Sequence, residues 1–223
     1  MNHKSTLHSL FVLCLLCASL AGFSQNAYRS KQTGANYSWT TIANWETFNG
    51  TSWVPASAYP VSTDGIITIS AADSITLSTA ITVDQLVVDG ILAIFSSSQT
   101  LNDGAGVDLQ VNGKLHMGLN GTLNGAGSLQ VNASGTLSFL LSGARVRTIT
   151  TNNGNTIVAN PTGTTGIETN SFTNNGTFTI NSGVFSINNC ELINNNLVVI
   201  NSVSPASYIL SAGTAPAGQL NNT

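Results

Sequence analysis

The sequence predicts an all-β fold, a parallel β-helix (solenoid) of about six coils, from three observations. Strand-type segments recur at a nearly constant interval, turn residues recur with them, and charged side chains are scarce. Charged residues make up 7% of the chain, against about 25% in ordinary globular proteins, and 42% of the residues are hydrophobic. The polar positions hold Asn, Ser, Thr and Gly, which favour turns, and the apolar residues between them favour strands.

The interval between strand segments is the strongest of these observations. Six segments begin at a turn residue and continue as an alternating strand, and their first apolar residues stand at 92, 115, 137, 157, 178 and 198. The gaps between these positions are 23, 22, 20, 21 and 20 residues. A coil of fixed perimeter requires such a constant interval, whereas the geometry of a globular sandwich does not.

Alternation within the segments predicts which side chains face the interior of the coil. The expected inward pairs are Leu92/Ile94, Leu115/Met117, Leu137/Phe139, Ile157/Ala159, Phe178/Ile180 and Val198/Ile200. A second strand of each coil is expected at Val107, Leu109 and Val111, then Leu129 and Val131, then Val146 and Thr148, then Phe185 and Ile187. A third, weaker strand is expected around Leu101 and Leu123, which gives three short strands for each turn of the helix.

The turn residues repeat with the strands. Stacked at one bend, they would form an internal ladder in which each side chain bonds those above and below it, at the ~4.8 Å spacing of neighbouring strands. Such a ladder would satisfy polar groups without charges; solvated turn asparagines are the alternative. The residues expected to form it are Asp89, Asn112, Asn132, Asn153, Asn175 and Asn195.

The beginning of the chain has the pattern of an export signal. Lys4 precedes an apolar run from Leu10 to Ala21, and small residues Gly22 and Ser24 precede a cut before Gln25. The run is too short for a membrane-spanning helix, which takes ~20 residues. Residues 1–24 are therefore expected to be a signal peptide, and the mature protein is expected to be secreted or displayed at the cell surface without inserting into the membrane.

The rest of the chain divides into three parts. Residues 25–84 are expected to form an aromatic N-terminal cap with lead-in strands, because Trp39, Trp45 and Trp53 lie there and the repeats contain no tryptophan. Residues 85–203 are expected to form the parallel β-helix repeats. Residues 204–223 are expected to be an irregular C-terminal tail, and the asymmetry between the two ends suggests a fragment of a longer surface protein.

The pattern Trp39, Trp45, Trp53-Val54-Pro55, followed by Asp64 and an alternating strand, resembles the start of large exported proteins of Bacteroidota. The segment Ala21-Gly22-Phe23-Ser24-Gln25 is similar to the end of their signals. The resemblance implies a right-handed, autotransporter-type or adhesin-type β-helix exported by the type IX route. The chain departs from that pattern because no β-rich sorting domain is visible after Val203. Ser74 in Asp73-Ser74-Ile75 also matches the O-glycosylation acceptor pattern of that phylum.

Few residues offer catalytic chemistry. β-Helices host pectate-lyase-like enzymes, which need converging acids and a nearby base, and the residues that would have to converge are Asp103, Asp108, Lys114 and His116. The alternative is that these four residues are simply solvated positions on the outside of the coil. Zinc would lack ligands in the mature chain, where His116 is the one histidine and Cys190 the one cysteine, expected to pack in the core. No cofactor or metal is expected.

The candidate ligand-binding residues are three tryptophans and two arginines. Trp39, Trp45 and Trp53 would stack on sugars if exposed and would plug the end of the coil if buried, which is the favoured interpretation. Arg145 and Arg147 flank Val146 on one outer face, where they would hold an acidic glycan or simply aid solubility. A flat array of Thr136/Ser138, Thr156/Val158 and Thr177/Thr179 would resemble an ice-binding surface.

These observations favour a non-catalytic extracellular scaffold or adhesin-like segment that contacts surface glycans or other cell-surface proteins. Beyond the signal, nine acidic residues stand against five basic ones, which argues against nucleic acid as a partner. The alternative is a polysaccharide-acting enzyme or its carbohydrate-binding module, and a lesser alternative is an ice-binding solenoid.

Overall fold

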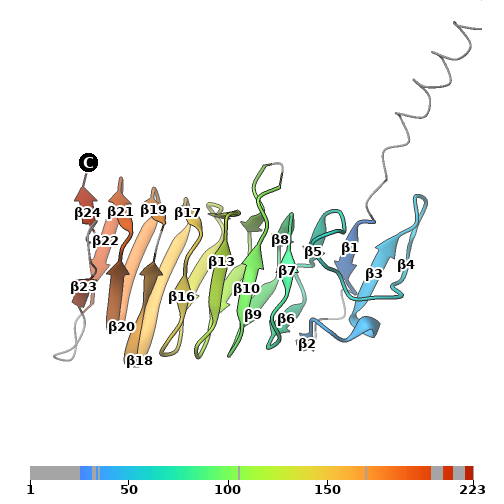
Figure 1. The fold of residues 1–223 in the computed structure, drawn as a ribbon, viewed down its shortest axis with the longest axis horizontal. Helices are drawn as coiled ribbons and strands as arrows, with labels where there is room; N and C mark the ends of the chain where they lie inside the picture. The colour runs from blue at the N-terminus through green and yellow to red at the C-terminus, as the bar shows by residue number, and fades with distance from the viewer. Residues whose placement is uncertain are drawn as a thin grey trace, which may run out of the picture.

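The computed structural model describes residues 26–31, 34, 36–104, 106–168, 170–201, 208–212 and 219–222. They form a rod in which the strands of successive coils lie side by side (Figure 1). Almost all neighbouring strands pair in parallel, as the interval predicts, and three strands in each coil build three faces around one apolar core. The parallel β-solenoid of about six coils is therefore confirmed.

One face is an 11-stranded sheet. Its first three strands form an antiparallel start at the N-terminal end, and the rest are parallel. In spatial order the strands are β4 (Trp53–Pro55), β3 (Trp45–Phe48), β1 (Tyr28–Ser30), β5 (Ile67–Ile69), β8 (Leu86–Val88), β11 (Leu109–Val111), β14 (Ser128–Val131), β17 (Ile149–Asn152), β19 (Ser171–Asn174), β21 (Glu191–Asn194) and β24 (Gln219–Asn222).

The other two faces belong to one 13-stranded sheet, because the long strands β18 (Asn155–Glu168) and β20 (Thr177–Asn188) continue from one face to the next. The second face adds β2 (Asn36–Ser38), β6 (Ser74–Leu77), β9 (Ile91–Ile94), β12 (Lys114–Met117), β15 (Thr136–Phe139) and β22 (Leu197–Ile200). The third adds β7 (Thr82–Val83), β10 (Ser98–Leu101), β13 (Thr122–Gly125), β16 (Arg145–Val146) and β23 (Tyr208–Ala212). A short 3-10 helix, η1 (Ile42–Asn44), lies in the N-terminal cap.

The inward pairs of the second face are confirmed in four of the six segments, and their side chains are buried: Leu92/Ile94, Leu115/Met117, Leu137/Phe139 and Phe178/Ile180. The pair Ile157/Ala159 is wrong. Thr156 pairs with Leu137 and Val158 with Phe139, so these two residues face the core and Ile157 faces outward. A strand that mixes Thr, Ile and Val alternates equally well in either phase, and only its neighbours in the stack fix the choice.

The second strand of each coil is confirmed at Leu109, Val111, Leu129 and Val131, but its later members are wrong. The next coils continue this face with Thr150/Asn152, Phe172/Asn174 and Leu192/Asn194. Val146, Phe185 and Ile187 are buried on the third face instead, in the strands that follow β10 and β13. Leu101 and Leu123 do belong to that face, although Leu123 pairs with Gln99 rather than with Leu101.

The tail prediction is wrong for the parts of it that the structure describes. β23 pairs in parallel with β20, and β24 pairs in parallel with β21, so residues 208–212 and 219–222 extend the stack by another coil. The predicted signal peptide, residues 1–24, lies outside the described residues.

The expected amide ladder forms, but on the surface and in two runs. Asn112 donates to Asp89 at 2.8 Å and Asn132 donates to Asn112 at 2.6 Å. Beyond a break, Asn175 donates to Asn153 at 3.0 Å and Asn195 donates to Asn175 at 2.8 Å. At the break, the Gln130 amide donates to the side-chain oxygen of Asn132 at 2.6 Å.

A second amide ladder is internal and was not expected. Asn152 donates to Asn174 and Asn174 donates to Asn194, both at 2.7 Å, and Asn152 and Asn174 are fully buried. These residues continue an inward row that holds valine in the earlier coils, since Val131 pairs with Asn152. The side-chain oxygen of Asn152 has no hydrogen-bond partner, because the row places the apolar Val131 before it.

Glycines allow the coils to approach at the bend beside the ladders. A Cβ on Gly113 would lie 2.1 Å from the carbonyl oxygen of Gly90, and one on Gly176 would lie 2.0 Å from that of Gly154. These contacts are far shorter than van der Waals distance, so a side chain at either position would push the stacked bends apart.

The two ladders give a matched test of burial. We expect Asn174→Ala to lower the free energy of unfolding by about 1–3 kcal/mol, because it removes one buried hydrogen bond to Asn152 and one to Asn194. Asn175→Ala, the adjacent change in the exposed ladder, should cost only about 0.5 kcal/mol. Urea unfolding followed by circular dichroism measures both, and equal effects would contradict the buried ladder.

Candidate functional site

Two of the three cap tryptophans belong to the core. Trp39 and Trp45 are fully buried, and their rings meet edge to face with centroids 4.9 Å apart. The Trp39 indole N–H donates to the carbonyl of Pro60 at 3.0 Å, and that of Trp45 donates to the carbonyl of Trp39 at 2.7 Å. Neither ring can stack on a sugar in this arrangement, so they plug the end of the coil.

Trp53 differs from the other two because it is only half-buried. Its ring lies 5.5 Å from that of Phe48, and the Arg29 guanidinium sits over it at 4.5 Å from the ring centroid. Arg29 also donates to Glu46 at 2.7 Å. One face of the Trp53 ring is therefore covered by a cation, which leaves it as a partly exposed aromatic side chain at the N-terminal end of the rod.

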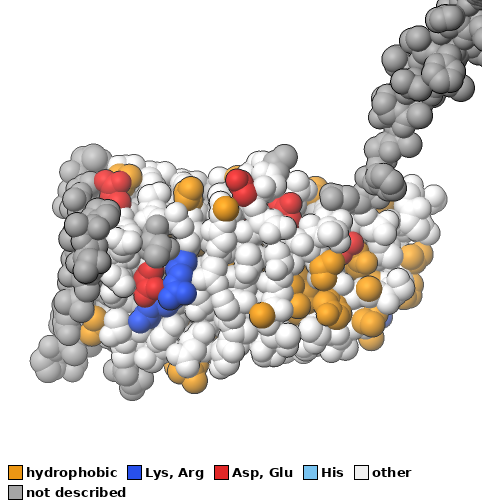
Figure 2. Space-filling model, viewed as in Figure 1, with side chains coloured by type: hydrophobic (Ala, Val, Ile, Leu, Met, Phe, Trp, Pro, Cys, Tyr) orange, Lys and Arg blue, Asp and Glu red, His pale blue; other side chains and the backbone are white. Residues whose placement is uncertain are grey.

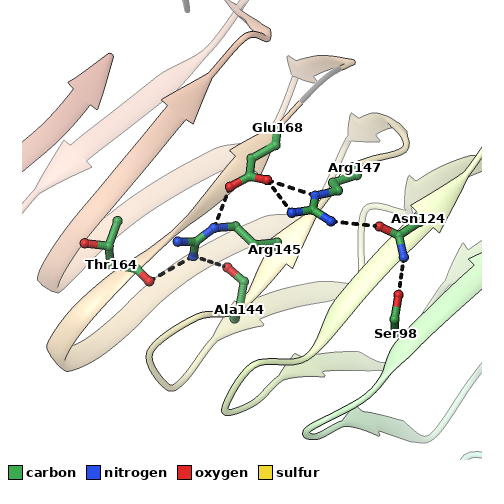
Figure 3. Close-up of polar contacts among 7 residues, drawn as sticks. All are labelled: Ser98, Asn124, Ala144, Arg145, Arg147, Thr164 and Glu168. Carbon is green, nitrogen blue, oxygen red and sulfur yellow. Dashed lines mark hydrogen bonds and ion pairs between the residues drawn. The ribbon is translucent and has the colours of Figure 1, made fainter. Parts of the chain in front are cut away.

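Arg145 and Arg147 do project from one outer face, and Glu168 stands between them (Figure 3). Arg145 donates to one carboxylate oxygen at 2.6 Å and Arg147 to the other at 2.8 Å. Arg145 also donates to the carbonyls of Ala144 and Thr164, both at 2.9 Å. One carboxylate therefore neutralises half of the charge that the two arginines bring.

The two arginines differ in exposure. The side chain of Arg145 is 20% exposed and that of Arg147 is 43% exposed, while Glu168 is 14% exposed. Arg147 reaches the side-chain oxygen of Asn124 at 3.5 Å, and the Asn124 amide in turn donates to the Ser98 hydroxyl (Figure 3). A row of polar side chains thus crosses the third face, with Arg147 its most accessible charged member.

The surrounding surface is mostly uncharged. Figure 2 shows basic side chains gathered over the region of β16 and β18, next to an acidic one, on a face made chiefly of uncharged polar groups. Hydrophobic side chains gather at the N-terminal end of the same face (Figure 2). Among the described residues, Ile42, Phe48 and Val61 are large apolar side chains of that end with more than a third of their surface exposed.

Asp108 is a structural residue. It is only 1% exposed, and its carboxylate accepts hydrogen bonds from the backbone N–H groups of Gly104 and Ser128, at 2.9 and 2.6 Å, and from the Ser128 hydroxyl at 3.0 Å. Burial opposes its ionisation, but these donors outweigh burial and lower the pKa of Asp108 below the ordinary value. The residue ties the bend at Gly104 to the next coil.

Asp84, which the sequence did not single out, lies beside Asp108. Burial raises the pKa of Asp84, and a hydrogen bond to Asp108 and the negative charges of Asp108 and Asp103 raise it further. A pocket of about 230 Å³ lies nearby on the first face. It is lined by Ile66, Gln85, Val87, Gly106, Val107 and Gln110, and neither Asp84 nor Asp108 is among the lining residues.

The four residues that a lyase-like site would need do not share one environment. Asp103 and Asp108 lie between β10 of the third face and β11 of the first face, where both raise the pKa of Asp84. Lys114 and His116 stand on β12 of the second face, where burial and then the charge of Lys114 lower the pKa of His116. Within the described residues, no cluster of three or more His, Cys, Asp or Glu side chains is placed to hold a metal ion.

The remaining candidates are also explained by packing or stay untested. Cys190 is buried, as expected, and burial raises the pKa of its thiol to about 11. Ser74 lies in β6, which is paired on both sides by β2 and β9. Its modification stays a prediction. The three-coil threonine array does not form, because the outward residues of its middle coil are Asn155 and Ile157.

Comparison with known proteins gives no relative. No family model, no curated protein and no solved structure matches the chain. What the fold defines is the architectural class, a β-solenoid, and the resemblance to exported proteins of Bacteroidota stays a prediction. No helix in the described part of the chain is long and apolar enough to cross a membrane.

Glu168 and Asp84 were missed in the sequence, although a signal for both was present. Glu168 follows Arg145 by 23 residues, and Asp108 follows Asp84 by 24, which is close to the length of one coil. Residues separated by one coil stand next to each other in the stack, so charged pairs at this interval indicate contacts.

Removing Glu168 should show which arginine depends on it. We expect the coupling energy of Arg145 with Glu168 to be about 1 kcal/mol and that of Arg147 to be smaller, since the more exposed pair is better screened. Double-mutant cycles with Arg145→Ala, Arg147→Ala and Glu168→Gln measure both. A stronger coupling for Arg147, or one that does not weaken in salt, would contradict this arrangement.

The raised pKa of Asp84 predicts a pH dependence. With a folded pKa above 3.8, the folded state binds more protons than the unfolded state just above that pH, so stability falls as the pH rises through the folded value. We expect Asp84→Asn to stabilise the protein at pH 7 and the gain to vanish below pH 3.8. Asp103→Asn removes only the smallest contribution to this shift, so its gain should be smaller. A loss of stability at pH 7 in Asp84→Asn would show that the charged form is favoured instead.

Proposed function

We propose that the chain is a non-catalytic extracellular scaffold, adhesin-like, that displays its side faces to surface glycans or other cell-surface proteins. The observation that carries the proposal is the structural use of the residues best suited to chemistry. Asp108 holds a bend, Trp39 and Trp45 plug the cap, and Cys190 packs in the core. What the rod offers to a partner is a row of hydroxyl, amide and guanidinium groups on a rigid surface.

The third face is the side that we assign to glycan contact. Its outer row contains Ser98, Asn124 and Arg147, which are joined by hydrogen bonds across three coils. Fixed amides and a guanidinium donate well to sugar hydroxyls and carboxylates, and holding them in place beforehand lowers the entropy cost of binding. Trp53, at the N-terminal end, is a second candidate contact.

A glycan array tests this assignment. We expect the full chain to bind glycans that carry carboxylate or sulfate groups, and Arg147→Ala to weaken that binding about tenfold, as the loss of a charge-assisted contact predicts. Lys114→Ala removes a positive charge from the second face and is the matched control. Absence of binding to any glycan, or an equal loss in both variants, would contradict the glycan contact and leave a structural role.

The rival function is a polysaccharide-acting enzyme. The specific observation in its favour is that Asp84 and Asp108 have pKa values displaced in opposite directions, as paired acids and bases do. Against it, Asp108 is nearly inaccessible and committed to three hydrogen bonds. Incubation with a panel of polysaccharides, followed by reducing-end and unsaturated-product assays, should give no turnover. Turnover that Asp84→Asn abolishes would overturn the scaffold proposal.

A further inference from the structure

The pocket on the outer surface of the first face has the size of a site for one ring. Its volume is about 230 Å³, below the ~300–1,000 Å³ of sites that take drug-sized ligands. Val87 of β8 and Gln110 of β11 form its floor, because they are paired, outward-facing residues of neighbouring strands. Its walls come from the bends that lead into β5, β8 and β11, and consist of Ile66, Gln85, Gly106 and Val107.

The bends that form the walls are held by hydrogen bonds to the backbone. Gln85 has a φ of +50°, in the left-handed region that residues other than glycine rarely adopt. The carboxylate of Asp84 accepts the backbone N–H of Gln85, and the carbonyl of Gln85 accepts that of Ile67 at 3.1 Å. Asp108 accepts the N–H of Gly104 at 2.9 Å and so fixes the chain that leads to the other wall. A wall that is already in place lowers the entropy cost of binding a ligand.

Gln110 presents its side-chain amide to the pocket. Leu109 and Val111 on either side of it face the core, and Gln110 is half-buried on the outside. The next glutamine in the same outward row, Gln130, is committed to Asn132 at 2.6 Å. Among the described residues, the side chain of Gln110 has no hydrogen-bond partner. A half-buried amide of this kind is best satisfied by a ligand that offers it a donor or an acceptor.

The chemistry of the lining indicates what the ligand carries. Ile66, Val87 and Val107 are aliphatic, Gln85 and Gln110 carry amides, and no lining residue is charged. A charged ligand would lose its hydration here without meeting an opposite charge. The N–H and C=O of an acetamido group point in opposite directions, so two separate carboxamides, one in the wall and one in the floor, can bond both. Its methyl group suits the aliphatic side chains.

We propose that this pocket binds one N-acetylhexosamine unit of a surface glycan. Gln85 and Gln110 bond the N–H and C=O of its acetamido group, and the methyl group lies against the aliphatic side chains. The inference rests on the proposed contact with surface glycans, but it names another site and another class of sugar. The third-face contact recognises negative charge, whereas this pocket recognises a neutral sugar by its acetamido group.

The same surface continues from the pocket to the partly exposed aromatic pair of the N-terminal end. Ile66 stands opposite Ala27, just before β1, and the carbonyl of Ala27 accepts the backbone N–H of Phe48 at 3.0 Å. The ring of Phe48 lies 5.5 Å from that of Trp53. Two strand spacings of ~4.8 Å therefore separate Ile66 from Phe48. A glycan with one unit in the pocket can place a further unit on the aromatic pair.

Calorimetric titration of the full chain with the β-1,4-linked trimer of N-acetylglucosamine tests the pocket. The matched ligand is the glucose trimer of the same linkage, which carries a hydroxyl in place of each acetamido group. We expect it to bind about tenfold more weakly, because the hydrogen bonds of the acetamido group are lost.

Variants of the lining test the same assignment from the side of the protein. Gln110→Ala should weaken binding of the N-acetylglucosamine trimer about tenfold. Gln130→Ala removes the next glutamine of the outward row, which does not line the pocket, and should leave binding unchanged. Val87→Phe should abolish binding by an independent route, because the larger side chain fills the pocket from its floor. Far-ultraviolet circular dichroism checks that each variant is folded.

Two further measurements distinguish the pocket from other contacts. Affinity for the N-acetylglucosamine trimer should not change between low and high salt, since no lining residue is charged, whereas an acidic glycan held by Arg147 should bind more weakly in high salt. Trp53→Ala should weaken binding of the trimer but not of the methyl glycoside of N-acetylglucosamine, because only the longer ligand reaches the aromatic pair.

The proposal is overturned by equal affinity for the two trimers, by no binding of either, or by an equal loss in folded Gln110→Ala and Gln130→Ala. Acidic glycans that bind through Arg147 while neither trimer binds would show that the pocket assignment alone is wrong. Binding of the N-acetylglucosamine trimer through Gln110, with no binding of acidic glycans, would leave the pocket standing and remove the third-face contact. Absence of binding to any glycan would contradict both.

Discussion

The fold depends on one constraint: parallel coils stack in register, so each inward side chain has the equivalent residues of the neighbouring coils directly above and below it. A row of valines satisfies this requirement by apolar contact, and a row of asparagines satisfies it by hydrogen bonds. The row that runs through Val88, Val111 and Val131 changes from the first solution to the second at Asn152, and Asn194 still follows the second. Either solution is compatible with a buried column, but a boundary between them leaves one amide oxygen unsatisfied, and it does so at Asn152.

The same constraint explains how the chain manages with so few charges. Polar groups at the bends bond the equivalent groups of neighbouring coils, so part of their hydrogen bonding is supplied within the stack. Two acidic residues are used where the stack is irregular. Asp108 fixes the bend at Gly104, and Glu168 holds two arginines at the point where β16 meets the long strand β18. Phenylalanines fill the C-terminal half of the core, where Phe178 contacts both Phe172 and Phe185 edge to face.

The interval between strands predicted the architecture because a coil of fixed perimeter leaves a period that survives changes of individual residues. The same signal could not fix the phase of every strand. Thr156-Ile157-Val158-Ala159 alternates in either phase, and the paired strand β15 selects the one that buries Val158 and leaves Ile157 outside. The internal ladder had a local signal in the doubled asparagines at 152–153, 174–175 and 194–195, which replace a Val-Asn pair at 111–112 and 131–132. The partners of Arg145 and Asp108 depend on residues one coil away, so they become visible only when the period is applied to charges as well as to apolar residues.

Nuclear magnetic resonance of the asparagine side chains tests the in-register stack most directly. If the coils stack in register, the side-chain amide protons of Asn152 and Asn174 exchange slowly with solvent. They should also show nuclear Overhauser contacts to the residue one coil on, Asn174 and Asn194 respectively. The amide protons of Asn175 and Asn195, on the exposed ladder, should exchange faster. Equal and rapid exchange at all four residues, with no contacts between coils, would contradict the buried ladder and the register on which the structure depends.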